Sequence, residues 1–522
     1  MASRASRGAT AALALRVRRA PPLGVRRATA ALALALALLS SGCADDGSGP
    51  PSSSTLEVTY VDADGNGVLE RGPGEPLIDS TDLAPRARLG WVLATLAQIS
   101  DAHVRDEESP ARVPVVDRLG SPFESTFRPQ EALTAQVLAA TVRSANTLAP
   151  SGVLVSGDLA DNAQANELEA SLATLRGGLV APDSGSPGYD GVQAASDPDP
   201  FFYRPDVDAP RFPGLLDRAQ RPFRSPGLRA PWFPVMGNHD LLLAGEASPT
   251  PSTAALAVGD RATAARDPAS LLPPGATDEG ATPELVDRAV ADALSGPTRR
   301  VPADPARRPL DPSRVVDRLR RAARVPGVGS RLDYAVDLGS RVRLVVLDTV
   351  DREGGSGATV AGDQLAWLDR QLAAAGPRWV LLASHQPLVS SEGGRAVLAR
   401  ADRDPQVIAA IAGHSHRNRI RPRPTATGGY WLIETASLVD FPQQARALRV
   451  RATTGGGVAI ETWMLDHDDR GAAGALAATS RRLAFLDAQG GRPQRFAGSR
   501  SDRNARLYLG RASRPASGRK PS

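Results

Sequence analysis

The chain has 522 residues, 42% of them hydrophobic, and a formal net charge of +5. The positive charge lies at the two ends, because residues 1–42 contain seven Arg and no acid, and residues 491–522 contain nine basic residues and one acid. The segment between them is net negative, which argues against a specific nucleic-acid-binding protein. The single cysteine, Cys43, excludes an intrachain disulfide.

The N-terminus is typical of a targeting segment. Several Arg residues precede an apolar run, Ala28–Leu39, which is too short to span a bilayer comfortably and ends in small residues. We therefore interpret residues 1–42 as a signal peptide and expect an exported protein. Arg26-Arg27 permits twin-arginine export as well as the general secretory route.

The position of Cys43 resembles a bacterial lipoprotein cleavage site, with Ser40 where a Leu is usual. A lipid on Cys43 would make the protein a cell-surface lipoprotein, and this anchor would be its sole contact with a membrane. The alternative is an ordinary secretory signal with an incidental cysteine and a secreted product.

Two short segments precede the main domain. Residues 43–56 have the composition of a flexible tether, and residues 57–89 form an N-terminal extension. The extension contains Asp62-Ala-Asp64-Gly-Asn66-Gly67, which matches the first half of an EF-hand loop, although Pro73 stands where the bidentate Glu belongs. A polar turn and a small calcium loop both fit this pattern.

The main domain, residues 90–465, begins with a strand–helix–strand pattern. Leu93–Ser100 and Val153–Ser156 read as buried strands, and residues 130–146 have helical spacing between them. Polar residues follow each strand, and ligands gather beyond the carboxyl ends of such strands. We expect strand alternation to put Asp101 and His103 on one face.

Two insertions rich in Pro, Asp and Arg, residues 181–230 and 244–330, interrupt this domain. The first reads as a surface segment, and the second contains helical patterns at 283–295 and 313–324. Loops of this length are usually functional lids or disordered, and both leave the domain beside conspicuous motifs. We favour a lid that shapes the pocket.

The remaining elements continue the α/β alternation. Strands are predicted at 334–338, 342–348, 379–382, 407–412, 430–435 and 458–464, and helices at 163–175 and 362–375. Residues 466–522 read as a C-terminal helix, 472–486, followed by a basic disordered tail.

Five of the six histidines fall in short motifs at the ends of apolar runs. These motifs are Ser-Asp-Ala-His (100–103), Gly-Asp-Leu-Ala-Asp-Asn (157–162), Gly-Asn-His-Asp (237–240), Ser-His-Gln-Pro (384–387) and Gly-His-Ser-His (413–416). Imidazole and carboxylate groups are the ligands that Zn, Mn and Fe ions use. The sixth, His467, lies in an acidic turn and is assigned to the surface. Asp240 is expected to cap a helix.

This order of motifs resembles the calcineurin-like metallophosphoesterase superfamily, over roughly residues 90–465. The resemblance implies a four-layer α/β/β/α sandwich of two mixed sheets flanked by helices, and two divalent or trivalent ions (Mn, Fe or Zn). It assigns Asp101, His103 and His416 to the first metal, Asn238, His385 and His414 to the second, and Asp158 to both. His239 would face the substrate as an acid or transition-state stabiliser, oriented by Asp161.

The implied activity is hydrolysis of a small-molecule or nucleotide phosphate ester by a metal-bridging hydroxide, with monoesters and diesters both compatible. Asn162 and Asp240 replace the Arg and Glu of protein Ser/Thr phosphatases, and Asp161 stands where purple acid phosphatases have a metal-binding Tyr. The chain looks more like exported bacterial members, and its Arg-rich composition suggests an actinobacterial one. The alternative is a metal-stabilised surface binding or envelope-structural lipoprotein without turnover, against which His239 and Asp161 argue.

Overall fold

The computed structural model describes residues 53–119, 126–264, 267–268, 282–489 and 494–510. The predicted signal peptide, Cys43, most of the tether and the end of the basic tail lie outside the described residues. Within the described chain, no helix is long and apolar enough to cross a membrane.

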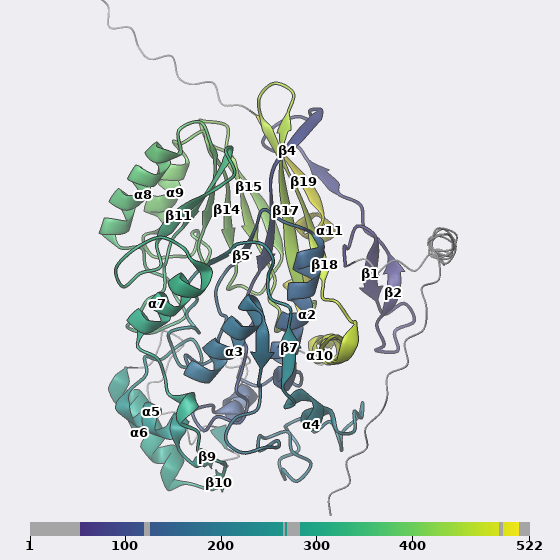
Figure 1. Ribbon diagram of the computed structural model, residues 1–522, viewed down its shortest axis with the longest axis vertical. Helices are drawn as coiled ribbons and strands as arrows, with labels where there is room; N and C mark the ends of the chain where they lie inside the picture. The colour runs from purple at the N-terminus through teal and green to yellow at the C-terminus, as the bar shows by residue number, and fades with distance from the viewer. Residues whose placement is uncertain (1–52, 120–125, 265–266, 269–281, 490–493, 511–522) are drawn as a thin grey trace, which may run out of the picture. The chain divides into compact units, whose positions relative to one another are not determined.

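Seven strands form the first sheet (Figure 1). In spatial order they are β3 (Ile78–Ser80), β19 (Ala505–Leu509), β18 (Val458–Asp466), β17 (Gln444–Thr453), β4 (Leu89–Ile99), β5 (Gly152–Val155) and β8 (Trp232–Pro234). β4, β5 and β8 are parallel, whereas β17 and β18 run antiparallel to their neighbours. The parallel strands bring the ends of β4, β5 and β8 to one edge of the sheet.

The second sheet has six strands, in the order β11 (Tyr334–Leu338), β12 (Val342–Val346), β13 (Trp379–Ala383), β14 (Val407–Ala412), β16 (Tyr430–Glu434) and β15 (Arg419–Arg423). The four strands β12, β13, β14 and β16 are parallel, and the two outer strands are antiparallel. Every residue of β14 is buried, as expected of a parallel strand covered on both faces.

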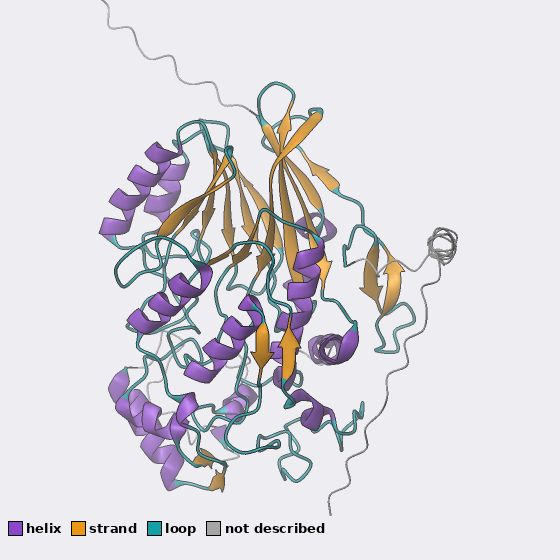
Figure 2. Ribbon diagram, in the orientation of Figure 1, coloured by secondary structure: helices purple, strands orange, loops and turns teal. Residues whose placement is uncertain are grey.

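The side chains of β13 show how the layers pack. Leu381 and Ala383 face the main core, which includes residues of the first sheet, whereas Val380 and Leu382 pack with residues of α8 (Gly362–Ala375) and α9 (Gly394–Ala401). On the first sheet, α2 (Thr134–Thr147) contacts β17 and β18, and α10 (Gly471–Gln489) packs beside α2. The expected α/β fold, two mixed sheets flanked by helices, is confirmed (Figure 2).

The insertion 181–230 is less exposed than predicted. It contains α4 (Leu215–Ala219) and β7 (Phe223–Ser225), and the latter pairs with β6 (Gly178–Val180). Leu215 and Leu216 of α4 pack with residues of α10 in a separate apolar cluster. The surface interpretation is wrong for these residues, because a 50-residue segment can bury its own apolar side chains against the domain.

The described residues of the second insertion, 244–330, contain three α-helices and two strands. These are α5 (Pro251–Val258), β9 (Arg261–Thr263), α6 (Pro283–Ser295), β10 (Thr298–Arg300) and α7 (Pro312–Ala323). Both predicted helices are present. Val315, Val316 and Leu319 of α7 belong to the main core, so the last part of this segment is a layer of the domain and not a lid.

The segment after residue 465 differs from the sequence-based expectation in two places. Residues 505–509 form β19, which pairs with β18 on one side and β3 on the other, so the prediction of a disordered tail is wrong there. The strand forms because Ala505, Leu507 and Leu509 alternate into the core. His467 is also not at the surface: it is 2% exposed, and Arg481 on α10 contacts its Nδ1 at 2.8 Å.

Residues 62–67 lie in the loop that joins the antiparallel strands β1 (Val58–Val61) and β2 (Glu70–Pro73). The Asp62 carboxylate accepts hydrogen bonds from the backbone N–H groups of Asn66 and Gly67 at 3.0 and 3.1 Å. These bonds fit the polar-turn interpretation.

Candidate metal centre and active site

The five motifs lie together at the carboxyl ends of parallel strands. Asp101 and His103 follow β4, Asp158 follows β5, and Asn238 and His239 follow β8 in the first sheet. In the second sheet His385 follows β13, and His414 and His416 follow β14. The two sheets therefore contribute to one site residues as far apart in sequence as Asp101 and His416.

Five of these residues have a left-handed backbone, with φ between 43° and 63°: Asp101, His103, Asp158, His414 and His416. This conformation is uncommon for residues other than glycine and costs roughly 1–3 kcal/mol each. The expected strand alternation at Asp101 and His103 is wrong, because β4 ends at Ile99 and a sharp turn directs both side chains to the site. Such strain is typical of functional sites.

Groups of potential metal ligands converge here. Asp101, His103 and His416 form one, Asp158, His385 and His414 a second, and His103, Asp158 and His239 a third, each with ligand atoms within 4.8 Å of one another. Ligands about 2.0–2.2 Å from one ion lie up to about 4.4 Å apart, so these spacings fit shared metal ions. Mixed imidazole and carboxylate donors suit Zn, Mn and Fe.

In the first group, two imidazole nitrogens face each other. His103 Nε2 and His416 Nε2 are 3.2 Å apart, and His416 Nε2 is 3.5 Å from Asp101 Oδ1. Each ring is held from its other side. His103 Nδ1 lies 2.9 Å from Asp161 Oδ1, and His416 Nδ1 lies 2.5 Å from Asp440 Oδ2. A carboxylate at Nδ1 fixes the tautomer that leaves Nε2 available to a metal.

Asp158 lies between the groups. Its Oδ2 is 3.1 Å from His385 Nε2 and 3.6 Å from His103 Nε2, and its Oδ1 accepts a hydrogen bond from the His239 backbone N–H at 2.9 Å. Burial raises the pKa of Asp158, but His385 and His239 outweigh burial and hold that pKa well below its usual range. Asp158 is therefore ionised and central, as a carboxylate shared by two cations must be.

The second group is oriented by the backbone. His385 Nδ1–H donates to the Ser156 carbonyl at 2.7 Å, and His385 Nε2 is 3.1 Å from Asn238 Oδ1. Asn238 Nδ2 donates to the Gly245 carbonyl at 2.9 Å, which turns Oδ1 toward His385. Burial and the nearby His385 lower the pKa of His414 to about 3, which keeps this imidazole neutral and able to bind a metal.

The sequence model of the family described as calcineurin-like phosphoesterase matches residues 94–418. The chain belongs to the calcineurin-like phosphoesterase family. Membership, together with the His/Asp clusters, supports metal-dependent hydrolysis of phosphoesters at a candidate dinuclear centre.

The solved structures that are similar to the chain include the following two, and both are remote. A dimetal phosphatase from Danio rerio shares 13% identity over 72% of this chain and 97% of its own, with a TM-score of 0.37. A purple acid phosphatase from yellow lupin (Lupinus luteus) seeds shares 12% identity over 76% of this chain and 54% of its own, with a TM-score of 0.31. No curated protein sequence matches the chain.

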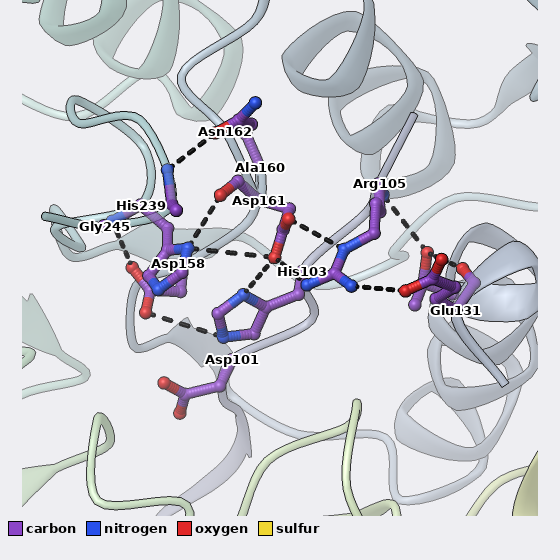
Figure 3. Close-up of polar contacts among 12 residues, drawn as sticks. Asp101, His103, Arg105, Glu131, Asp158, Ala160, Asp161, Asn162, His239 and Gly245 are labelled. Carbon is purple, nitrogen blue, oxygen red and sulfur yellow. Dashed lines mark hydrogen bonds and ion pairs between the residues drawn. The ribbon is translucent and has the colours of Figure 1, made fainter. Parts of the chain in front are cut away.

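In this calcineurin-like phosphoesterase, His239 is partly exposed, with 14% of its side chain accessible, whereas the side chains of His103 and His385 are 2% and 0% exposed. Its Nδ1–H donates to the Asp161 backbone carbonyl at 2.7 Å, whereas the Asp161 carboxylate is 3.7 Å away. The Asp161 carboxylate instead contacts His103 and Arg105 (Figure 3). The expected orientation of His239 by the Asp161 side chain is therefore corrected, because the carbonyl of Asp161 makes the shorter contact.

Asp240 does not cap a helix. Its carboxylate accepts hydrogen bonds from the backbone N–H groups of Gly237, Asp158, Leu159 and Ala160 at 2.9–3.1 Å. The next helix, α5, begins only at Pro251. Asp240 thus ties the turn after β8 to the turn after β5 and fixes the backbone of Asp158.

Sequence reasoning missed Asp440 and the arginines behind the histidines. Asp440 follows β16 in the unremarkable segment Ser437-Leu-Val-Asp440, where no spacing links it to His416. The role of Arg105 could have been suspected from the sequence, because this residue lies two positions beyond His103 in a segment already assigned to the site.

Proposed function

We propose that this protein hydrolyses phosphate esters of small molecules or nucleotides with two metal ions. The observation that carries the proposal is the position of Asp158 Oδ2, between His385 Nε2 at 3.1 Å and His103 Nε2 at 3.6 Å. A carboxylate placed between two imidazole groups is suited to bridging two cations. Asp101, His103 and His416 would hold one, and Asn238, His385 and His414 the other.

Two bound cations would bind phosphate oxygens and lower the pKa of a water molecule so that it can attack phosphorus. The residues supply orientation. The carbonyl and carboxylate contacts at the Nδ1 atoms of His103, His385 and His416 leave their Nε2 atoms directed inward. Asp240 holds the backbone on which Asp158 sits.

His239 would act on the substrate without being needed as a ligand. Donation of Nδ1–H to the Asp161 carbonyl fixes its ring, and its partial exposure allows contact with a substrate. In its protonated form the ring can give a proton to the leaving-group oxygen. No step requires a covalent enzyme intermediate.

The test is turnover of p-nitrophenyl phosphate and bis(p-nitrophenyl) phosphate by purified protein reconstituted with Mn²⁺. We expect hydrolysis of at least one substrate, abolished by chelation and restored by Mn²⁺, and absent in Asp158→Asn. Full metal occupancy with no turnover of either ester would contradict the proposal and favour the non-catalytic binding protein. The ratio of the two rates separates monoesterase from diesterase activity.

We further propose that the protein works outside the cytoplasm. The proposal is supported by the Arg-rich start and apolar run of residues 1–42 and by the position of Cys43. A lipid at Cys43 would hold the catalytic domain at the cell surface.

A further inference from the structure

The two histidines of the first ligand group are each backed by an Asp and an Arg. We call each His–Asp–Arg chain of contacts a relay. In the first relay, His103 Nδ1 contacts Asp161 Oδ1 at 2.9 Å. Arg105 grips the same carboxylate with two parallel bonds, Nε to Oδ2 at 2.7 Å and Nη2 to Oδ1 at 2.8 Å. A bidentate pair of this kind fixes the plane of the carboxylate as well as its position.

The second relay has the same order. His416 Nδ1 contacts Asp440 Oδ2 at 2.5 Å, and Arg128 binds that carboxylate through Nε at 2.6 Å and Nη2 at 3.1 Å. Asp440 and Arg128 are 312 positions apart in sequence, so this pairing exists only in the folded chain.

Both relays meet at Glu131, at the start of the turn that leads into α2. Its Oε2 accepts from Arg105 Nη1 at 2.7 Å and from the backbone N–H of Arg128 at 3.1 Å. Arg112 adds two further bonds, at 2.8 and 3.0 Å. Figure 3 shows Arg105 between Asp161 and Glu131. One glutamate thus contacts the arginine of the first relay and the backbone of the arginine of the second.

The network is balanced in charge and buried. It contains three carboxylates and three guanidinium groups, from Arg105, Arg112, Arg128, Glu131, Asp161 and Asp440, and the Glu131 side chain is 0% exposed. Burying ions costs several kcal/mol each, and apolar residues of similar volume usually stabilise a fold as well or better. Stability alone therefore does not explain these six buried charges. Orientation of the two metal-binding imidazole rings explains them.

The second ligand group lacks such a network among the described residues. His385 is held by the Ser156 carbonyl and Asn238 by the Gly245 carbonyl, both backbone groups that a side-chain substitution at Glu131 leaves in place. The two metal sites are thus supported by different means.

We propose that Glu131 is a positioning residue for the first metal site, acting through Arg105–Asp161 on His103 and through Arg128–Asp440 on His416. The proposal rests on the proposed function in requiring that a metal bind Asp101, His103 and His416. Loss of Glu131 weakens that site selectively, because its rings lose their fixed direction while the second site keeps its backbone supports.

The experiment measures Mn²⁺ binding by calorimetry in single-site backgrounds. His414→Ala removes a ligand of the second site and leaves the first, and His416→Ala does the reverse. Adding Glu131→Gln to the His414→Ala background, which keeps only the first site, should weaken Mn²⁺ binding about 10–100-fold. This is the usual effect of losing a group that orients a metal-binding histidine. Adding Glu131→Gln to the His416→Ala background, which keeps only the second site, should change the Mn²⁺ affinity by no more than about twofold.

Glu461→Gln is the matched control. Glu461 is a buried glutamate on β18 that also contacts two arginines, Arg506 at 3.0 Å and Arg451 at 3.7 Å. Its substitution should leave both Mn²⁺ affinities unchanged. If Glu131→Gln does not fold, Arg128→Lys is measured in its place. This substitution keeps the positive charge but loses the two hydrogen bonds from Arg128 to Asp440, so the Mn²⁺ affinity of the first site should fall.

Unchanged first-site affinity, equal losses at both sites, or the same loss in Glu461→Gln would overturn the proposal. In the full chain, excess Mn²⁺ should restore turnover in Glu131→Gln, because the defect is one of occupancy. The affinities are measured without substrate, so an inactive wild-type protein that binds two Mn²⁺ ions would refute the proposed hydrolase and leave the role of Glu131 to be decided by binding.

Discussion

Asp158 Oδ2 lies 3.1 Å from His385 Nε2, although the two residues follow strands of different sheets. The contact joins the turn after β5 to the turn after β13. It also places the one carboxylate common to two ligand groups where two cations would otherwise face each other with little compensating charge.

Substitution of Asp158 by Asn should therefore remove metal and activity together. The amide keeps the size of the side chain but removes the negative charge that two cations would share. We expect lower metal content in the purified variant by elemental analysis, and loss of ester hydrolysis. An Asp158→Asn protein that retains two metals would show that this carboxylate does not bridge them.

His239→Ala should separate catalysis from metal binding. No ligand is lost in our assignment, so metal content should stay unchanged, while the rate falls about 10²–10⁴-fold because a proton donor is removed. The loss should be largest for alkyl phosphates, whose leaving groups need protonation, and smaller for p-nitrophenyl phosphate. Because His239 also lies within 4.8 Å of His103 and Asp158, loss of metal in this variant would make it a ligand.

Gly157→Ala should displace His385. The backbone at Gly157 has φ of +100°, and an added Cβ would lie 2.3 Å from His385 Nδ1, the atom that donates to Ser156. We expect loss of second-site metal and lower activity, besides a strain of roughly 1–3 kcal/mol. Metal titration and thermal unfolding measure the two effects.

Gly188→Ala is the control for backbone strain. Gly188 has a similar φ of +112°, but an added Cβ meets nothing within 4 Å. Its substitution should destabilise the fold comparably and leave metal binding intact. If both variants lose metal to the same degree, general destabilisation and not the contact with His385 is responsible.

Cys43→Ala should release the protein from the membrane fraction of the producing cell, because a single lipid-bearing residue would be its anchor. Immunoblots of membrane and soluble fractions check this. Unchanged fractionation would exclude a lipid at Cys43 as the anchor, and would leave a secreted protein or an uncleaved signal peptide.

The sequence by itself determined the elements and the composition of the site. Apolar runs such as 407–412 and the helical spacing of 362–375 are local patterns, and the structure has β14 and α8 at these residues. Five histidines at the ends of such runs were recognisable because histidine is rare in this chain. The carboxyl ends of parallel strands in one sheet meet at one edge, so the convergence of Asp101 and Asp158 could be predicted without coordinates. His385 follows a strand of the other sheet, and its place in the site was expected only from the family resemblance.

The tertiary structure decided how these groups are held. The left-handed turns at Asp101 and His416, the four backbone bonds to Asp240, and the convergence of Arg105 and Arg128 on Glu131 leave no periodic trace in the sequence. The burial of His467 and the pairing of β19 with β18 were missed for the same reason. Hydrogen bonds and ion pairs join residues that are distant in the chain, and their energies depend on the folded positions of both partners, which local propensity does not encode.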